Sequence, residues 1–505
     1  MLVRRQPWGR ICHDKKFWRT RAPRQNIAPY SRRSVKNKMH IRSNKYLLAI
    51  SAILIASTFS VYAVNISDTD LLILIMMIPL IAYTSYRYIT CLNHYFRPMY
   101  WSLMFYMTFA FLIPGAYQAS NDDYYMFWAG GYSFTAISTA IIFLYASIFT
   151  IDVGYRIGFG KTLNPNFPKP QKGHGAASPK LILIATISVL GIAAIFLGVA
   201  IYQLGISAFI GTRAAITAHF NDLGYTGGAT RGFFSGLVRQ FSILALIFTI
   251  YLFVATKQSV FKFPIVFTAI VICAVAINPL AMPRFITLGT ALSGFILMVW
   301  YYQINSKILI IAPPLALYTV APLLAGYNRG TEVSQLYFIP FSEYIRFADF
   351  DGMHMLILSI EYTLDNGLQM GRQVVSALLF FVPRSVWPEK ALPTGTLLAQ
   401  HEGFPFTNFS SSVFAEVWID FGVLGLLLIW ILGFALGRID RLFNSGNATF
   451  YFILGTISLA GVLPMLVRGS LLGMIPQTIF LFIIPLFIKY IFRILFSNSS
   501  DTRHL

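Results

Sequence analysis

Charged side chains are scarce in this chain, and acidic ones are the scarcest. Charged residues make up 11% of the 505 positions, with 39 Lys and Arg against 19 Asp and Glu. A soluble domain carries roughly 25% charged residues, whereas 56% of this chain is hydrophobic. This composition excludes a soluble globular fold and indicates a protein whose solvent is largely lipid.

Signatures of disulfide, metal and nucleotide chemistry are also missing from the sequence. The three cysteines, Cys12, Cys91 and Cys273, show neither disulfide nor metal-ligand spacing. The eight histidines form no HxxH or HExxH pattern, and no phosphate-binding loop of the Walker A type occurs. We therefore expect no metal, no other cofactor and no nucleic-acid partner.

Long apolar runs are what the chain has in abundance. A run of about 20 apolar residues crosses a bilayer as a helix, because backbone groups in lipid must be satisfied internally. We predict an all-α, polytopic integral membrane protein with about twelve transmembrane helices: Tyr46–Val64, Leu71–Thr90, Tyr100–Gln118, Tyr132–Ile151, Leu181–Leu204, Gln240–Ala255, Pro264–Met282, Phe285–Tyr302, Ile308–Gly326, Phe421–Gly437, Thr449–Val467 and Leu471–Ile491. Pro283-Arg284 joins two of these spans so tightly that the pair could also be one broken helix.

The positive charges predict the orientation of these spans. Residues 1–45 carry fourteen Lys and Arg and one acid, which predicts a disordered cytoplasmic tail. Twelve spans then put both termini in the cytoplasm, with 29 of the 39 cations on that side. The tail has no apolar core, so it is not a signal peptide, and Met39 is an equally good start of translation. The expected division is the tail 1–45, nine spans in 46–326, an outer loop 327–418 and three spans in 419–505.

Arginine dominates the cations left on the outer side. Nine of these ten cations are arginines, which can bind phosphate through two parallel hydrogen bonds. The excess points to an anionic ligand. Arg239 and Arg468 lie at span ends, and we interpret them as side chains that only reach the headgroups. A second outer loop, residues 205–236, could complete a substrate cavity with Arg213 and Arg231.

The apolar pattern breaks for long only once, between Asn328 and Trp418. The first part, Tyr344–Glu361, has apolar residues at helical spacing and predicts an amphipathic interfacial helix that presents Arg346, Asp351 and His354. The second part, Asp365–Phe381, predicts a re-entrant or interfacial helix. The third part, Val382–Trp418, contains four prolines, which fix φ and remove backbone donors, so we expect ordered loop rather than helix.

The third part also carries most of the reactive side chains, namely Arg384, Glu389, Lys390, His401, Glu402 and Glu416. Within residues 371–425, the elements Pro383-Arg384, Trp387-Pro388 and Lys390, followed by Glu416 and Phe421-Gly422, resemble the O-antigen polymerase (Wzy-type) family of oligosaccharide repeat-unit polymerases. Ala391 and Pro393 stand where that family often has proline directly after the lysine. The resemblance also implies a GT-C-like fold with one large periplasmic loop between late spans.

The resemblance implies a metal-independent glycosyltransferase of the bacterial inner membrane. Its substrate would be an oligosaccharide linked to undecaprenyl diphosphate, and a chain-length-regulating membrane protein could be its partner. The leaving diphosphate needs guanidinium groups, and the acceptor hydroxyl needs a base. The candidate catalytic residues are Arg284, Arg329, Arg384, Glu416 and His401, and the candidate substrate-binding residues are Arg213, Arg231, Arg346, Arg372, Lys390, Asp351, His354 and Trp387.

Two other functions fit much of the same sequence. An O-antigen ligase, which transfers glycan to lipid A-core, would share the topology and the arginines. A lipid-linked oligosaccharide flippase would instead predict charges within the spans and internal repeats, and we find neither pattern.

Overall fold

The computed structural model describes residues 68–92, 96–120, 131–160, 179–210, 229–256, 262–278, 284–302, 304, 307–329, 339–404, 407, 409–445 and 448–495. The chain divides into two compact units, Met1–Ile50 and Ser51–Leu505, and every described residue belongs to the second. The predicted basic tail and the first predicted span, Tyr46–Val64, lie outside the described residues.

The described residues are almost entirely helical, and ten helices among them are long and apolar enough to cross a membrane. These are α2 (Asp68–Thr90), the continuous α3–η1–α4 (Pro98–Phe105, Tyr106–Leu112 and Ile113–Ser120), α5 (Phe134–Phe159), α6 (Pro179–Leu204), α8 (Ala229–Ala255), α10 (Arg284–Tyr302), α11 (Lys307–Arg329), the continuous α16–η4–α17 (Val413–Phe421, Gly422–Gly425 and Leu426–Phe443), α18 (Phe450–Arg468) and α19 (Leu471–Leu495). Each overlaps a predicted span, which confirms a helical, polytopic membrane protein.

One predicted span, Pro264–Met282, corresponds to a shorter helix. α9 (Lys262–Ala276) has 15 residues, and a helix of that length rises about 22 Å. This is less than the bilayer's hydrocarbon core of about 30 Å. Together with the span that lies outside the described residues, α9 is why ten long helices are seen rather than twelve.

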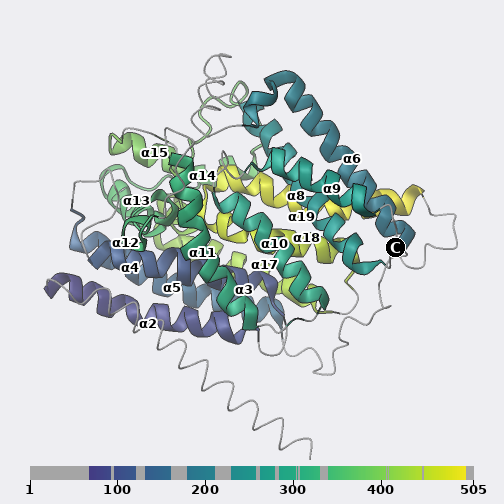
Figure 1. The fold of residues 1–505 in the computed structure, drawn as a ribbon. Helices are drawn as coiled ribbons and strands as arrows, with labels where there is room; N and C mark the ends of the chain where they lie inside the picture. The colour runs from purple at the N-terminus through teal and green to yellow at the C-terminus, as the bar shows by residue number, and fades with distance from the viewer. Residues whose placement is uncertain are drawn as a thin grey trace, which may run out of the picture. The chain divides into compact units, whose positions relative to one another are not determined.

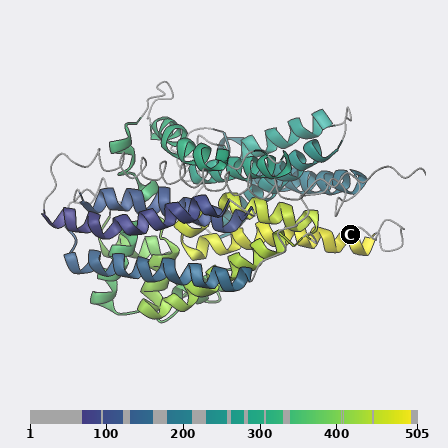
Figure 2. The ribbon, with the colours of Figure 1, turned by 90° about the horizontal axis from the view of Figure 1, so that it is seen from below.

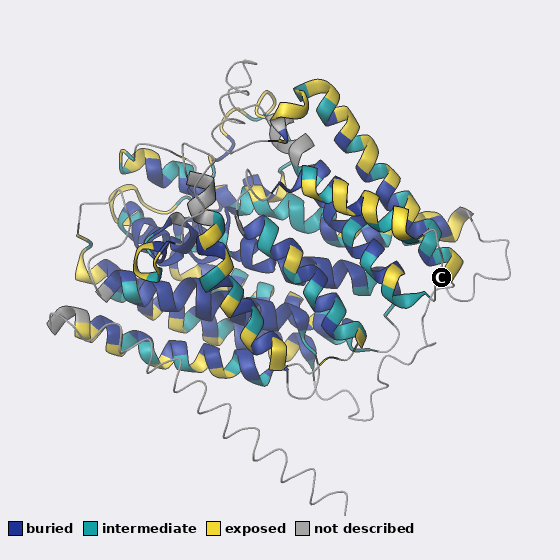
Figure 3. Cartoon of the chain, in the orientation of Figure 1, coloured by how far each residue is buried: buried dark blue, intermediate teal, exposed yellow. Residues whose placement is uncertain are grey.

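The long helices pack as neighbours along much of their length (Figure 1, Figure 2). α5 packs along α17, α6 along α8, and α18 along both α10 and α19. Nearly every residue of α3–η1–α4 and of α18 is buried, so these two helices form the core of the bundle (Figure 3). The bundle is the term used below for the ten long helices.

The α5–α17 contact is very close, because both helices place glycines in it. A Cβ atom on Gly433 would lie 2.4 Å from the carbonyl oxygen of Ile151, and one on Gly158 would lie 2.2 Å from that of Phe434. Small residues four apart let two membrane helices approach to backbone contact. This packing lies toward the C-terminal ends of α5 and α17 and holds the two helices together there.

Two buried carboxylates tie the same ends of these helices to their neighbours. Asp152 of α5 pairs with Arg87 of α2 and accepts a hydrogen bond from the Tyr100 hydroxyl at 2.7 Å. Asp440 of α17 accepts hydrogen bonds from the backbone nitrogen of Tyr100 at 3.1 Å and from the Tyr155 hydroxyl at 3.0 Å. Both carboxylates are therefore neutralised or fully bonded by neighbouring helices.

Three prolines inside the membrane helices are matched by hydroxyl groups of adjacent helices. A proline removes the donor that would bind the carbonyl four residues earlier. Pro313 and Pro314 of α11 free the carbonyls of Leu309 and Ile310, and the Tyr88 hydroxyl of α2 donates to these at 2.5 and 3.3 Å. An unsatisfied carbonyl in lipid costs several kcal/mol, so Tyr88 fixes α2 against α11.

The same device joins α3 to α18. Pro464 of α18 frees the carbonyl of Ala460, and the Ser102 hydroxyl of α3 donates to that oxygen. In η1, which is a π-helix, the carbonyl of Phe109 accepts a hydrogen bond from Tyr318 of α11 at 2.5 Å. The core helices are thus joined by directed polar contacts as well as by apolar packing.

The polypeptide between α11 and α16 folds into short helices. These are α12 (Phe341–Tyr344), η3 (Ala348–Phe350), α13 (Gly352–Asn366), α14 (Arg372–Leu378) and α15 (Thr394–His401). We call residues 339–412 the inter-span segment.

Two predictions for the inter-span segment were wrong. Met353 to Ile360 of α13 are all buried, so α13 is a core helix rather than an amphipathic helix at an interface. Residues 382–418 are not continuous loop, since they contain α15 and the start of α16. Pro393 immediately precedes α15, a place where proline favours a helix start instead of preventing it. Within the predicted re-entrant or interfacial helix Asp365–Phe381, the structure has the shorter α14, and Leu378 at its end and Phe381 beyond it are 57% and 68% exposed.

Candidate functional site

The inter-span segment meets the bundle at the turn between α18 and α19. Arg468 ends α18, and its Nη2 atom lies 3.3 Å from Oδ1 of Asp351, just before α13. Arg468 Nε also donates to the backbone carbonyl of Asp349 at 3.0 Å. The side chain of Arg468 is 14% exposed and that of Asp351 is fully buried. This ion pair therefore links the bundle to the inter-span segment in a dry environment.

Ser410 completes the surroundings of Asp351. Its hydroxyl donates to Asp351 Oδ1 and Oδ2 at 2.6 and 2.7 Å. Burial raises the pKa of Asp351, and the Arg468 charge and the Ser410 hydrogen bond lower it in part. Ser410 is only half-buried, so it stands between this carboxylate and the surface of the segment.

A second carboxylate, Glu416, reaches the same turn from α16. Its Oε2 atom accepts a hydrogen bond from the backbone nitrogen of Leu471, the first residue of α19, at 2.8 Å. The Ser412 side chain caps α16 by accepting from the backbone nitrogen of Ala415, which fixes the first turn that carries Glu416. Two buried carboxylates, Asp351 and Glu416, therefore flank the turn Arg468–Leu471.

The π-helix η1 packs directly against this site. A Cβ atom at Gly352 would lie 2.6 Å from Phe111 and 3.2 Å from the Tyr106 hydroxyl. Only glycine lets the chain after Asp351 approach η1 this closely. π-helical turns are frequent at functional sites because they shift side chains out of the regular helical register.

His354 lies one turn further along α13 and is fully buried. The Tyr132 hydroxyl is hydrogen-bonded to His354 Nδ1, and the ring of Phe404 stacks on the imidazole with centroids 6.1 Å apart. Burial lowers the pKa of His354 to about 3. The imidazole is therefore neutral at physiological pH, and it is suited to hydrogen bonding rather than to holding a positive charge beside an anion.

The cations of the sequence element around Pro383 bind backbone carbonyls. Arg384 donates from Nη1 to the carbonyl of Lys390 at 2.5 Å and from Nη2 to that of Ala391 at 2.7 Å. Lys390 Nζ donates to three carbonyls at the end of α14 and just beyond, those of Leu379, Phe380 and Val382, at 2.9 to 3.0 Å. A cation at a helix C-terminus stabilises the unpaired carbonyls there. The element therefore folds this loop.

Arg372 contributes to the same loop from the start of α14. Its Nε and Nη2 atoms donate to the carbonyl of Glu389 at 3.1 and 2.6 Å. At the same helix end, Asp420 of α16 accepts hydrogen bonds from the backbone nitrogens of Gln373 and Val374 at 3.1 and 2.8 Å. Asp420 was not predicted, and it serves as the N-terminal anchor of α14.

The other described candidates lie apart from the ion pair. His401 is exposed at the end of α15, with Nε2 3.8 Å from Asp365 and its ring against Tyr362. Trp387 is half-buried in the loop after α14, and Arg346 is half-buried after α12. Among the described side chains, no contact joins Arg372 or Arg384 to Arg468. The predicted gathering of the described arginines in one cavity is therefore not seen.

Four predicted arginines cannot be placed as side chains. Arg213 lies outside the described residues, and so do the side chains of Arg231, Arg284 and Arg329. The backbone positions are informative for two of them, because Arg284 begins α10 and Arg329 ends α11. The guanidinium of Arg468 lies 5.0 Å above the ring centroid of Phe285, so the first turn of α10 adjoins the ion pair.

Arg468 is the residue that the sequence interpretation missed. Its position at a span end suggested a side chain reaching toward headgroups, whereas it is only 14% exposed and is paired with Asp351. One signal was present in the sequence, since Asp349 and Asp351 are acids in an acid-poor chain, next to a strongly apolar helix. Buried acids require a cation or several donors, but sequence alone does not say which one.

In the part of the chain that the structure describes, no group of three or more His, Cys, Asp or Glu side chains could hold a metal ion. Comparisons with protein-family models, with curated proteins and with solved structures find no match to this chain. Any assignment of function therefore depends on the residues and contacts described above and on the resemblance within residues 371–425.

Proposed function

We propose that this protein is a membrane glycosyltransferase that polymerises oligosaccharide repeat units carried on undecaprenyl diphosphate. The observation that carries the proposal is the buried Arg468–Asp351 pair, with Glu416 at the same turn, beneath a folded inter-span segment. A lipid diphosphate needs a cationic site at headgroup level, and an acceptor hydroxyl needs a nearby carboxylate. The turn Arg468–Leu471 combines both.

The proposed roles follow from the partners of each side chain. Arg468 receives the negative charge that develops on the leaving diphosphate, and Asp351 and the Asp349 carbonyl hold the guanidinium in place. Among the described residues Glu416 accepts from neutral groups and has no paired cation, so it is the carboxylate left to take the acceptor proton. Arg284 and Arg329, at the ends of α10 and α11, are proposed to assist at the diphosphate.

Arg384, Arg372 and Lys390 have a different part in this proposal. They shape the loop after α14 by binding carbonyls, and they act on the substrate through the position of that loop. Trp387, which is half-buried, is proposed to contact sugar as a stacking surface. His354, which is fully buried, is proposed to support the site as a neutral hydrogen-bonding group.

The membrane orientation belongs to the same proposal. We place the protein in the bacterial inner membrane with about twelve spans, both termini in the cytoplasm and the inter-span segment in the periplasm. The supporting observation is the Lys and Arg distribution, with 29 of 39 on the proposed cytoplasmic side.

Analysis of surface glycan after deletion of the gene tests the function. A polymerase predicts loss of the long-chain ladder, with single capped repeats remaining. Full-length polymer accumulating on the lipid carrier would instead identify a ligase, and complete absence of surface glycan would identify a flippase. Either of these results would overturn the proposal.

Complementation of the deletion strain tests the site. Arg468→Lys keeps a charge but removes the planar fork, and the loss of one pre-placed donor costs about 10²–10³ in rate. We expect that variant to leave single repeats. Arg493→Lys, at the far end of α19, is the matched control and should restore the full ladder. A full ladder with Arg468→Lys at wild-type protein levels would contradict the role.

A further inference from the structure

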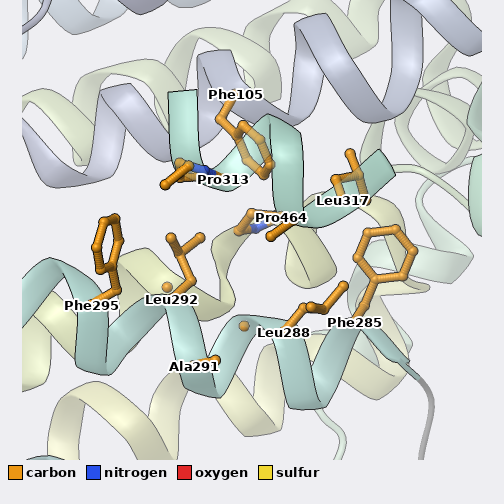
Figure 4. Close-up of a pocket in the computed structure, with 13 residues that line it drawn as sticks. Phe105, Phe285, Leu288, Ala291, Leu292, Phe295, Pro313, Leu317 and Pro464 are labelled. Carbon is orange, nitrogen blue, oxygen red and sulfur yellow. The ribbon is translucent and has the colours of Figure 1, made fainter. Parts of the chain in front are cut away.

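A groove between α10 and α11 ends close to the Arg468–Asp351 pair. It has a volume of about 240 Å³ and is lined by apolar residues of α3, α10, α11 and α18. Figure 4 shows Phe285, Leu288, Leu292 and Phe295 along one face of α10, opposite Pro313 and Leu317 of α11. Groups of this kind exclude water and offer no hydrogen bonds, so the groove suits a hydrocarbon chain.

The groove has a closed floor and an open side. Phe105 of α3 and Pro464 of α18 form the floor and are buried. Ala291 is exposed, and Leu288 and Phe295 are half-exposed, so the opposite side faces the surface of the bundle. On the lipid-facing surface of a membrane protein, such an opening leads into the bilayer.

The position of the groove along the helices is equally specific. From Phe285, in the first turn of α10, to Phe295 is ten residues, or about 15 Å of helix. This is half of the hydrocarbon core of about 30 Å. The groove therefore occupies one leaflet, and it is the leaflet whose headgroup level holds the turn Arg468–Leu471.

Charge distinguishes the two ends of the groove. At one end the guanidinium of Arg468 lies 5.0 Å above the Phe285 ring, and Arg284 begins the same helix turn. The rest of the lining is apolar. An occupant with an anionic group at one end and a long hydrocarbon chain matches both features.

We propose that this groove binds the isoprenoid chain of the lipid diphosphate donor, with the diphosphate at Arg468. The proposal rests on the proposed function. At about 240 Å³ the groove is smaller than the roughly 300–1,000 Å³ that enclose a drug-sized ligand. It therefore holds only the units next to the diphosphate, and the rest of the chain leaves through the open side into lipid.

Photo-crosslinking in nanodiscs tests this site without requiring catalysis. The probe is undecaprenyl phosphate with a diazirine in its first isoprene units, and the comparison is a diazirine-bearing phosphatidylglycerol. We expect the polyprenyl probe to label peptides from α10 and α11, and unlabelled undecaprenyl phosphate, but not phosphatidylglycerol, to compete. Equal competition by phosphatidylglycerol would mean that the groove holds bulk lipid, and this would overturn the proposal.

Two neighbouring positions in α11 provide a matched pair of variants. Ala316 lines the groove, whereas Leu315 is 58% exposed and does not. Ala316→Trp should reduce labelling about tenfold, the equivalent of 1.4 kcal/mol in affinity, and Leu315→Trp should leave it unchanged. Labelling that persists in Ala316→Trp while the thermal stability equals that of Leu315→Trp would overturn the proposal.

The assignment of the groove and the proposed function can be disproved independently of each other. If the deletion strain loses its ladder but the probe labels helices other than α10 and α11, the function stands and the groove assignment is wrong. If the probe labels the groove selectively but the deletion strain keeps its ladder, a lipid-phosphate site stands and the polymerase function is wrong.

Discussion

Tyr88 of α2 donates its hydroxyl hydrogen to the carbonyl oxygen of Leu309 in α11 at 2.5 Å, across 221 positions of sequence. The acceptor is a carbonyl that Pro313 has deprived of its helical partner. A hydrogen bond of this kind is required by the helix that receives it, because nothing in lipid can replace it.

Tyr88→Phe should therefore destabilise the protein. An unsatisfied buried carbonyl costs about 1–3 kcal/mol, and the ring itself is kept. The measurement is the melting temperature of the protein in detergent. Tyr86→Phe, at a side chain that is 57% exposed, is the control and should melt as the wild type does. Identical melting temperatures of the two variants would show that the Tyr88 hydrogen bond does not contribute to stability.

Substitution by alanine should change the stability of the protein in opposite directions at Gly433 and at Gly198. A Cβ at Gly433 would meet the carbonyl oxygen of Ile151 at 2.4 Å, whereas nothing lies within 4 Å of one at Gly198 in α6. Gly198→Ala should gain about 0.5–1 kcal/mol from helix propensity. Gly433→Ala should lower the melting temperature, because α5 and α17 must move apart. A stabilised Gly433→Ala variant would show that the α5–α17 contact is looser than described.

Variants of the ion pair at the α18–α19 turn should separate the effect of the pair on stability from its effect on activity. Asp351→Asn leaves the Arg468 guanidinium buried without its counter-ion, which costs about 3–5 kcal/mol. The double variant Arg468→Met with Asp351→Leu removes both charges and should recover most of that loss. Polymerisation should remain absent in both. Recovery of the glycan ladder in the double variant would exclude Arg468 from the reaction.

Arg384→Lys should loosen the loop after α14. Arg384 reaches two carbonyls, of Lys390 and Ala391, with two nitrogen atoms of one plane, and a lysine ammonium cannot span both. We expect faster limited proteolysis between Leu379 and Ala391 and loss of the ladder. Glu389→Gln is the control, since the contact at that position uses the backbone carbonyl. An Arg384→Lys variant with full activity and unchanged proteolysis would contradict this role.

His354 should make the protein less stable in mild acid. Its pKa is lowered to about 3 by burial, and its unfolded value is about 6.5. Between these values the unfolded chain binds the extra proton, so stability falls as the pH drops below about 6.5. From pH 7.5 to pH 5 the loss from this one group is about 2 kcal/mol. Melting temperatures at the two pH values measure it, and His354→Gln should reduce the difference.

The sequence was a good guide to the long helices and a poor guide to the inter-span segment. Apolar runs such as Leu71–Thr90 become helices because lipid allows few alternatives to a fully bonded backbone, so hydropathy alone predicts them. In the inter-span segment, residues 352–360 of α13 are buried on every side by contacts that include α5 and η1, which are far away in the sequence. No local pattern distinguishes such a helix from one at an interface.

The same limit applies to the side chains of the site, because the sequence identifies candidate residues but not their partners. Asp351, Glu416 and His354 were predicted as candidates because reactive residue types are rare in this chain. The partner of Asp351 is Arg468, 117 positions away, and that pairing is a property of the tertiary fold. Arg384 was predicted as a catalytic residue and Lys390 as a substrate-binding one, and the structure gives both of them carbonyl partners that only a folded loop provides.

The Arg468–Asp351 pair also limits how the inter-span segment can move. Lifting that segment from the bundle would break this pair and would also expose the apolar residues among 353–360 of α13, which are buried against α5, η1 and their neighbours. The inter-span segment therefore acts as a fixed cover rather than as a mobile lid. In the proposed reaction, a lipid-linked donor must therefore reach the Arg468–Asp351 pair from the side, between helices.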